Sequence, residues 1–159
     1  MPVPEFITQL RSKIGHAPLW LVGVTAVVHD ADRVLLVRRS DSGEWSSVSG
    51  IVEPGEHPAV TAVREALEEA CVEVVVERLS AVNVTRPVTY PNGDQSQYTN
   101  LVFRCRYLGG IAAVGDDEST EVAWFPFDAL PPLSASEHAR LASAMRDEPD
   151  TLLDLATEA

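Results

Sequence analysis

Three glutamates in one segment with helical periodicity are the residues whose types and spacing point to chemistry. Glu65, Glu68 and Glu69 stand at positions i, i+3 and i+4, so at about 100° per residue they share an arc of roughly 100° on the helix. Like charges at these spacings repel, and Arg64 is the one cation within four residues. The helix alone leaves two interpretations open: a solvated acidic face, or a group of hard oxygen ligands for Mg²⁺ or Mn²⁺.

The segment before this helix separates the two interpretations. Residues 50–72 read GIVEPGEHPAVTAVREALEEACV, with Pro54-Gly55 marking a tight turn before the helix. This stretch resembles the signature box of the Nudix hydrolases: Gly, five residues, Glu, seven residues, Arg-Glu, an apolar residue, any residue, Glu-Glu, any residue, Gly and an apolar residue. Positions that match it are Gly50, Glu56, Arg64, Glu65, Glu68, Glu69 and Val72, with Ala66 in the apolar position.

Two positions depart from the family pattern. Cys71 stands where the box has a glycine, at the helix end where a left-handed backbone is convenient; the C-terminal turn therefore needs another explanation, whereas the ligand positions are intact. Val48-Ser49 replaces the Pro-Gly that frequently precedes the box.

The resemblance implies a site and a reaction. Glu65, Glu68 and Glu69 would bind divalent ions, with the carbonyl of Gly50 as a further ligand, and Glu56 would pair with Arg64 and hold the loop against the helix. The reaction would be hydrolysis of a pyrophosphate bond in a nucleoside diphosphate linked to another moiety. Bound Mg²⁺ would activate a water molecule, and Glu68 or Glu69 would be the base or the principal ligand.

Family members often take an extra carboxylate from a loop far along the chain. Glu118, in the acidic stretch of residues 115–119, lies six residues before Trp124 and matches that pattern. It is our candidate for a further metal ligand or for the base; the alternative is a solvated loop acid.

Substrate recognition in this family lies outside the box. Arginine can hold a phosphate with two hydrogen bonds, and aromatic rings can stack on a base, although packing is the plain alternative for the aromatic residues. Arg38 and Arg39 alternate on a predicted strand, so only one of them can face the site. The candidates are Arg38, Arg39, Arg86, Tyr90, Tyr98 and Phe103.

The rest of the chain supplies the elements that must position these residues. Helical spacing predicts helices over residues 5–15 and 58–70, and Ser134 followed by Glu137 predicts a capping box for a last helix that ends near Arg146. Apolar and β-branched runs predict strands over residues 19–28, 34–37, 72–76, 81–84, 88–90, 98–108 and 121–127. Strands that flank one central helix indicate a mixed α/β or α+β fold.

Composition bounds the function. The 159 residues include 12 Lys+Arg and 24 Asp+Glu, a formal net charge of −12, so the chain would repel a nucleic-acid backbone. If the substrate carries phosphates, a divalent cation is the simplest way to neutralise them together with the carboxylates of the protein. No apolar run is long enough to span a membrane and the first residues lack a basic region followed by an apolar run, so we expect a cytoplasmic protein. Cys71 and Cys105 have no metal-site spacing, and we expect two reduced thiols.

The resemblance also implies an architecture: a Nudix α/β/α sandwich with a mixed sheet and a loop–helix–loop box. We expect an N-terminal helical extension (1–17), a Nudix hydrolase domain (18–147) and an acidic tail (148–159) that frays. With its length, its N-terminal helix and its Tyr-Pro-Asn-Gly-Asp loop, the chain resembles the ADP-ribose pyrophosphatase-like branch of the family. The alternatives are a (d)NTP pyrophosphohydrolase and a non-catalytic nucleotide-binding module. A homodimer is a family expectation, with the first helix either packing on a partner or capping its own sheet.

Overall fold

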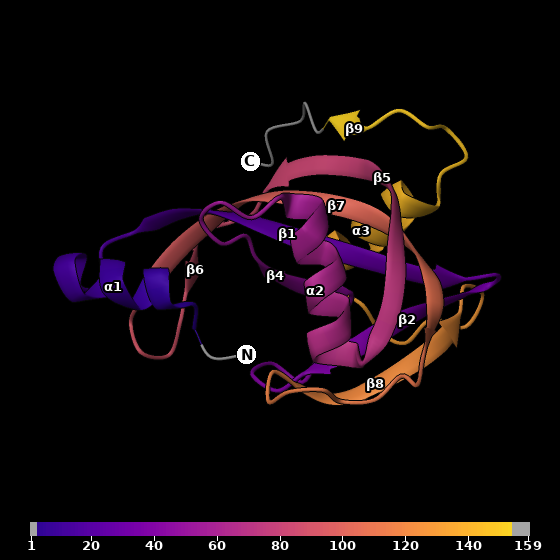
Figure 1. The fold of residues 1–159 in the computed structure, drawn as a ribbon, viewed down its shortest axis with the longest axis horizontal. Helices are drawn as coiled ribbons and strands as arrows, with labels where there is room; N and C mark the ends of the chain where they lie inside the picture. The colour runs from indigo at the N-terminus through magenta and orange to yellow at the C-terminus, as the bar shows by residue number, and fades with distance from the viewer. Residues whose placement is uncertain (1–2, 154–159) are drawn as a thin grey trace.

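The computed structural model describes residues 3–153, which form three helices and one sheet (Figure 1). In chain order the elements are α1 (Glu5–Ile14), β1 (Leu19–Asp30), β2 (Arg33–Arg39), β3 (Trp45–Ser46), β4 (Val48–Ile51), α2 (Pro58–Ala70), β5 (Val72–Val84), β6 (Val88–Thr89), β7 (Gln95–Gly110), β8 (Ser119–Pro126), α3 (Ala135–Met145) and β9 (Leu152–Leu153). The three helices and the long strands agree with the helical and β-branched patterns of the sequence.

The sheet is mixed. Its main path runs β3-β2-β1-β7-β5-β9, with β4 paired to β1, β6 to β7 and β8 to β2. β1 and β7 are parallel from Leu19↔Ser96 to His29↔Arg106, and β5 pairs antiparallel to β7. The parallel pair places residues about 75 positions apart side by side at the centre of the sheet.

A helix covers each face of the sheet, as the sandwich architecture requires. Val24, Ala26 and Val28 of β1 face the alanines of α2, whereas Val27 faces Leu141 and Ala144 of α3. This alternation is the two-residue period of a strand with both faces buried. The fold is therefore the mixed-sheet α/β/α arrangement that the resemblance implies.

Two local expectations from the sequence are wrong. Residues 72–76 and 81–84 belong to one strand, β5, because pairing with β7 continues across residues 77–80 with register shifts on both sides of Arg78 and Leu79. The short strands β3 and β4 were not predicted from the sequence. In the tail, Leu152–Leu153 pair in parallel with β5, so this part is not frayed; residues 154–159 lie outside the described part.

The last helix keeps one half of its predicted capping box. Ser134 Oγ accepts a hydrogen bond from the backbone N–H of Glu137 at 3.2 Å. The Glu137 carboxylate does not turn back to the cap. It accepts hydrogen bonds from the backbone N–H and hydroxyl of Ser47 and from Arg140, and so ties α3 to the segment between β3 and β4.

Helix α1 packs on its own chain. Arg11 donates to the carbonyls of Ala17 and Gln95 at 2.6 and 2.7 Å, and Ile7 is buried. Asp94, at the turn between β6 and β7, is hydrogen-bonded to the His16 ring at 2.7 Å and forms an ion pair with Arg11 at 3.4 Å. These contacts fix α1 beside the β6–β7 hairpin (Figure 1). Within residues 3–153, no helix combines the length and apolar character needed to cross a membrane.

Cys71 ends α2 in the left-handed conformation, with φ 57° and ψ 30°. Its backbone N–H donates to the carbonyls of Ala66 and Leu67, as a glycine would at this position. The turn that the box requires is therefore made without glycine, at a cost of about 1 kcal/mol for an L-residue in this region.

Replacing Cys71 with glycine is expected to raise the free energy of unfolding by about 1 kcal/mol, because the strain of the left-handed backbone is removed. The measurement is urea-induced unfolding of C71G beside wild type. L67G, an exposed change inside the same helix, is the control and should lower stability by about 1 kcal/mol. A C71G protein less stable than wild type would contradict the account.

Candidate active site

The small residues of α2 bring two of its three acids into the interior. Ala62, Ala66 and Ala70 are fully buried against the sheet, which allows the helix to pack closely. Glu65 and Glu69, on the adjoining arc, are only 1% and 4% exposed, whereas the side chain of Glu68 is 40% exposed. The acidic face of α2 is thus mostly buried, which argues against the interpretation as a solvated face.

Gly50 leaves space for the side chain of Glu65 between α2 and the sheet. A Cβ atom on Gly50 would overlap the carboxylate of Glu65, so a larger residue at this point of β4 would displace that side chain. The Glu65 side chain lies directly against the backbone whose carbonyl is the predicted additional ligand. The same strand is held by pairing Gly50 to Val24 of β1.

Arg64 links the loop to the helix acids. Its Nε and Nη2 donate to the two carboxylate oxygens of Glu56 at 2.9 and 3.0 Å, which is the pairing expected from the sequence. Its Nη1 donates to Glu65 at 2.9 Å and to Glu68 at 3.1 Å. The hydrogen bonds from Arg64 lower the pKa of Glu56 to about 2, so this carboxylate is held ionised.

The acidic loop before β8 is fastened to the C-terminal end of α2. Gly115 donates its backbone N–H to the carbonyl of Glu69 at 3.0 Å, and Ala113 donates to Ala70 at 3.1 Å. A Cβ atom on Gly115 would overlap the carbonyl of Glu68. This docking brings Glu118 to the helix acids, since its charge acts on both Glu65 and Glu69.

Burial dominates the electrostatics of these acids. Desolvation raises the pKa of Glu69 to about 9, with further increases from the carboxylates of Glu118, Glu65 and Asp116 and an opposing effect from Arg39. Desolvation also raises the pKa of Glu65 to about 7, opposed by Arg64. The nearby positive charges thus compensate only part of the cost of ionising these two buried acids.

The donor set fits a hard divalent cation. Glu65 Oε2 is buried and has no hydrogen-bond partner anywhere in residues 3–153, and the side chains of Glu65, Glu68, Glu69 and Glu118 offer carboxylate oxygens, the ligand atoms that Mg²⁺ and Mn²⁺ prefer. In that same part of the chain, no three acidic, His or Cys side chains form a ready ligand group. Arg64 Nη1 lies between Glu65 and Glu68 instead.

A cleft with a volume of about 970 Å³ opens beside these acids. It reaches from Glu65, Gly50 and Glu118 along the sheet to α1. Among the predicted substrate residues, Arg39, Tyr90 and Tyr98 line it. Arg39 acts electrostatically on Glu69 and Glu118 and forms an ion pair with Asp41 at 2.6 Å.

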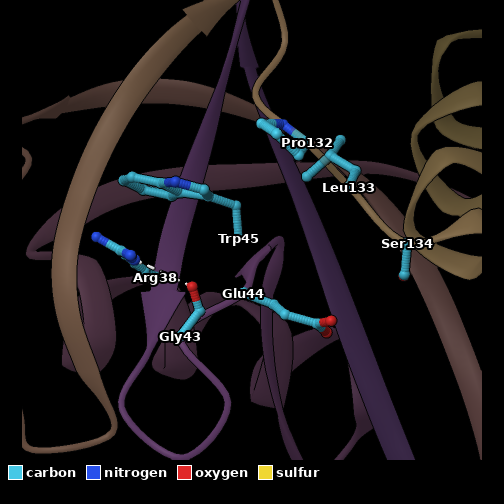
Figure 2. A pocket seen from close by; sticks show the side chains of 7 residues that line it. All are labelled: Arg38, Gly43, Glu44, Trp45, Pro132, Leu133 and Ser134. Carbon is cyan, nitrogen blue, oxygen red and sulfur yellow. Dashed lines mark hydrogen bonds between the residues drawn. The ribbon is translucent and has the colours of Figure 1, made fainter.

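The other predicted substrate residues lie elsewhere. Phe103 is buried in the core between β7 and α2, so packing is the correct interpretation for this ring. Arg38 alternates with Arg39 along β2 and donates to the carbonyl of Gly43 and to Glu121. It lies beside a depression of about 400 Å³ (Figure 2), which adjoins the cleft at Glu44, Trp45 and Ser134. Arg86 is exposed between β5 and β6 and does not line the cleft.

Sequence reasoning missed several residues that line the cleft. From α1 come Ile7 and Arg11, and from the sheet come Thr25 and Asn100. The periodicity of β1 and β7 marks Thr25 and Asn100 as strand positions, but their position in the cleft depends on the parallel pairing of strands far apart in the chain. The sequence signal that could have identified them is a polar residue inside an apolar strand segment.

Comparisons with known proteins agree with this geometry. A family model for the NUDIX domain matches residues 19–145. A MutT-like protein of Streptomyces ambofaciens is 36% identical over 132 residues, 80% of this chain and 79% of the relative. Dihydroneopterin triphosphate diphosphatase of Escherichia coli is 34% identical over 73% of this chain and 69% of that protein. The crystal structure of an ADP-ribose pyrophosphatase from Streptococcus suis superposes with a TM-score of 0.65 at 26% identity, covering 84% of this chain and 98% of that one.

The raised pKa of Glu69 predicts a pH-dependent stability in the absence of metal. Between pH 4.5 and about 9, the unfolded chain releases a proton that the folded Glu69 retains, so folding stability falls as pH rises through this window. In EDTA, the melting temperature of wild type is expected to fall relative to that of E69Q between about pH 5 and 8. A difference between the two proteins that stays constant or grows in favour of wild type would contradict this assignment.

Proposed function

This chain belongs to the Nudix family of hydrolases, and we propose that it hydrolyses the pyrophosphate bond of a nucleoside diphosphate linked to another moiety. The proposed substrate is ADP-ribose or a sugar nucleotide, and a nucleoside monophosphate is one product. The observation that carries the proposal is the burial of Glu65 and Glu69 on one helix, with Glu65 and Glu118 lining a large cleft. The negative charges of such a group of acids are compensated when a divalent cation binds between them and a phosphorylated ligand.

We assign the metal site to Glu65, Glu68, Glu69 and Glu118, with the carbonyl of Gly50 as a further ligand. When bound, Mg²⁺ or Mn²⁺ neutralises phosphate oxygens and lowers the pKa of a bound water molecule. Support comes from the unpartnered Oε2 of Glu65 within the described residues. Arg64 positions these acids: if it releases Glu65 and Glu68, it still has two hydrogen bonds to Glu56.

The remaining chemistry falls to the side chains of the protein. Glu68 or Glu69 accepts the proton of the attacking water. Arg39, at the cleft edge and close enough to act on Glu69 and Glu118, binds a substrate phosphate with its guanidinium group. A homodimer and a cytoplasmic location remain predictions from the sequence.

Relatives support two substrate classes. The S. suis enzyme is named an ADP-ribose pyrophosphatase, which favours the first class. The E. coli relative is named for a triphosphate, which favours the alternative of a (d)NTP pyrophosphohydrolase. The two classes differ in product, since the first yields a nucleoside monophosphate from a diphosphate linkage and the second releases pyrophosphate from a nucleoside triphosphate.

A product screen with Mg²⁺ or Mn²⁺ at about pH 8 tests the proposal. The panel holds ADP-ribose, sugar nucleotides, dinucleoside polyphosphates and (d)NTPs. AMP from ADP-ribose, or another monophosphate from a sugar nucleotide, is the expected product. Pyrophosphate from (d)NTPs alone would establish the alternative, and binding without turnover would indicate a non-catalytic module.

Loss of either candidate base is expected to slow turnover strongly. E68Q and E69Q should each lower kcat at least tenfold, a change of about 1.4 kcal/mol in the activation barrier. Steady-state kinetics on the best substrate of the panel measures this. E73Q, an exposed change on β5, is the control and should retain wild-type kcat; a loss below tenfold in both E68Q and E69Q would overturn the assignment.

The two neighbouring arginines provide a matched pair for the phosphate site. R39A is expected to raise KM about tenfold because Arg39 lines the cleft. R38A should leave KM within about twofold because Arg38 does not line the cleft and is bonded to Gly43 and Glu121 instead. Equal effects of the two substitutions on KM would contradict the placement of Arg39.

A further inference from the structure

We propose that Asn100 determines substrate specificity: its side-chain amide, at the floor of the cleft, donates a hydrogen bond to a carbonyl oxygen or ring nitrogen of the nucleotide base. The inference rests on the proposed function, because it assigns the base-binding part of the same cleft. It goes further in naming the group that reads the base and the chemical feature that the base must present.

An unsatisfied donor in a buried side chain is the first observation. Asn100 is 5% exposed, and its Oδ1 accepts a hydrogen bond from the hydroxyl of Thr25 at 3.2 Å. Its Nδ2 is buried and has no acceptor within residues 3–153. Leaving such a donor unpaired is unfavourable, so a buried example calls for a partner that arrives with the ligand.

Asn83 is the obvious internal partner, and it does not satisfy Asn100. The two residues stand directly opposite each other in β5 and β7. Asn83 Oδ1 is also without a partner in the described part of the chain. A bond between the two amides would satisfy both atoms, yet none is formed. Only Asn100 of this pair lines the cleft.

The pattern along the sheet shows why the cleft opens at Asn100. On the face that α3 covers, Val27 and Val102 belong to the core. Two positions before each of them the face turns polar, at Thr25 and Asn100, and both line the cleft. Because alternate residues share a face, one continuous sheet surface is buried under α3 and then becomes the floor of the cleft.

Gly23 connects this floor to the catalytic end. A Cβ atom on Gly23 would lie 3.5 Å from Asn100 Oδ1 and 3.7 Å from the carbonyl oxygen of Gly50. The amide and the proposed metal ligand are thus both within 4 Å of one point, near enough for a single nucleotide to reach both. The absence of a side chain at Gly23 leaves this passage open.

Tyr98 supplies an aromatic surface beside the amide. It is two residues before Asn100 on the same face of β7, and its ring is 3.4 Å from the position of a Cβ on Gly23. Its hydroxyl is bonded to that of Tyr90 at 2.7 Å, which fixes the ring. A flat ring next to a polar amide suits a planar heterocycle, which stacks through its face and is read through its edge.

The test measures binding of AMP, GMP, CMP and UMP by calorimetry, a readout that does not require turnover. Wild type is expected to prefer one base by at least tenfold in Kd. Asn100→Asp, which keeps the shape but removes the donor, should weaken binding of the preferred nucleotide at least tenfold and reduce the preference. Asn83→Asp, the matched change across the strand pair, should leave Kd within about twofold.

A second variant keeps the test valid if Asn100→Asp does not fold. Gly23→Ala places a methyl group at ordinary contact distances from its neighbours, so the fold should be retained while the floor of the cleft narrows and Kd for the preferred nucleotide rises at least fivefold. Unchanged Kd in both Asn100→Asp and Gly23→Ala would overturn the inference, as would equal binding of all four nucleotides by wild type.

The outcomes for the two proposals are distinguishable. If wild type hydrolyses the panel but Asn100→Asp leaves the base preference intact, the inference about Asn100 fails and the proposed function stands. If no substrate is hydrolysed while base-selective binding depends on Asn100, the proposed function fails and the assignment of the base site stands.

Discussion

Two carboxylates buried on one helix, Glu65 and Glu69, need space beside the sheet and a positive charge nearby, and the surrounding structure depends on both needs. The alanines of α2 allow the helix to approach the sheet, and Gly50 leaves space for the Glu65 carboxylate where any larger residue would overlap it. Burial makes ionisation of both acids unfavourable. Arg64 offsets part of that cost through its bond to Glu65, and a divalent cation would offset the remainder, so packing and metal binding depend on the same close contact between α2 and β4.

The sequence predicts the helices, the long strands and the acid cluster because each depends on local periodicity or on a box of fixed spacing. The pairing of Glu56 with Arg64 belongs to this class. Other features depend on contacts between distant segments. The continuity of β5 requires β7 as a partner, and the buried position of Phe103 follows from the sheet face that α2 covers. Cys71 shows a different limit: the hydrogen bonds at the end of α2 hold a left-handed backbone that residue type alone disfavours.

The cleft combines parts that lie far apart in the chain. Parallel pairing of β1 with β7 sets Gly23 beside Asn100, Arg11 fixes α1 against the start of β7, and Gly115 brings the acidic loop to α2. The end with the proposed metal ligands is built from the family's box, whereas the far end is built from α1 and the β6–β7 hairpin. The chemistry and the choice of base can therefore vary separately, and the substrate has to be sought in the residues outside the box.

The central claim is that the buried carboxylates form a divalent-cation site. Its most direct test is Mn²⁺ binding followed by electron paramagnetic resonance, in wild type, E65Q and E69Q, with E73Q as the control on an exposed glutamate of β5. We expect Mn²⁺ binding by wild type and E73Q, and affinity at least tenfold weaker in E65Q and E69Q. Equal affinity in all four proteins, or no Mn²⁺ binding by wild type, would contradict it.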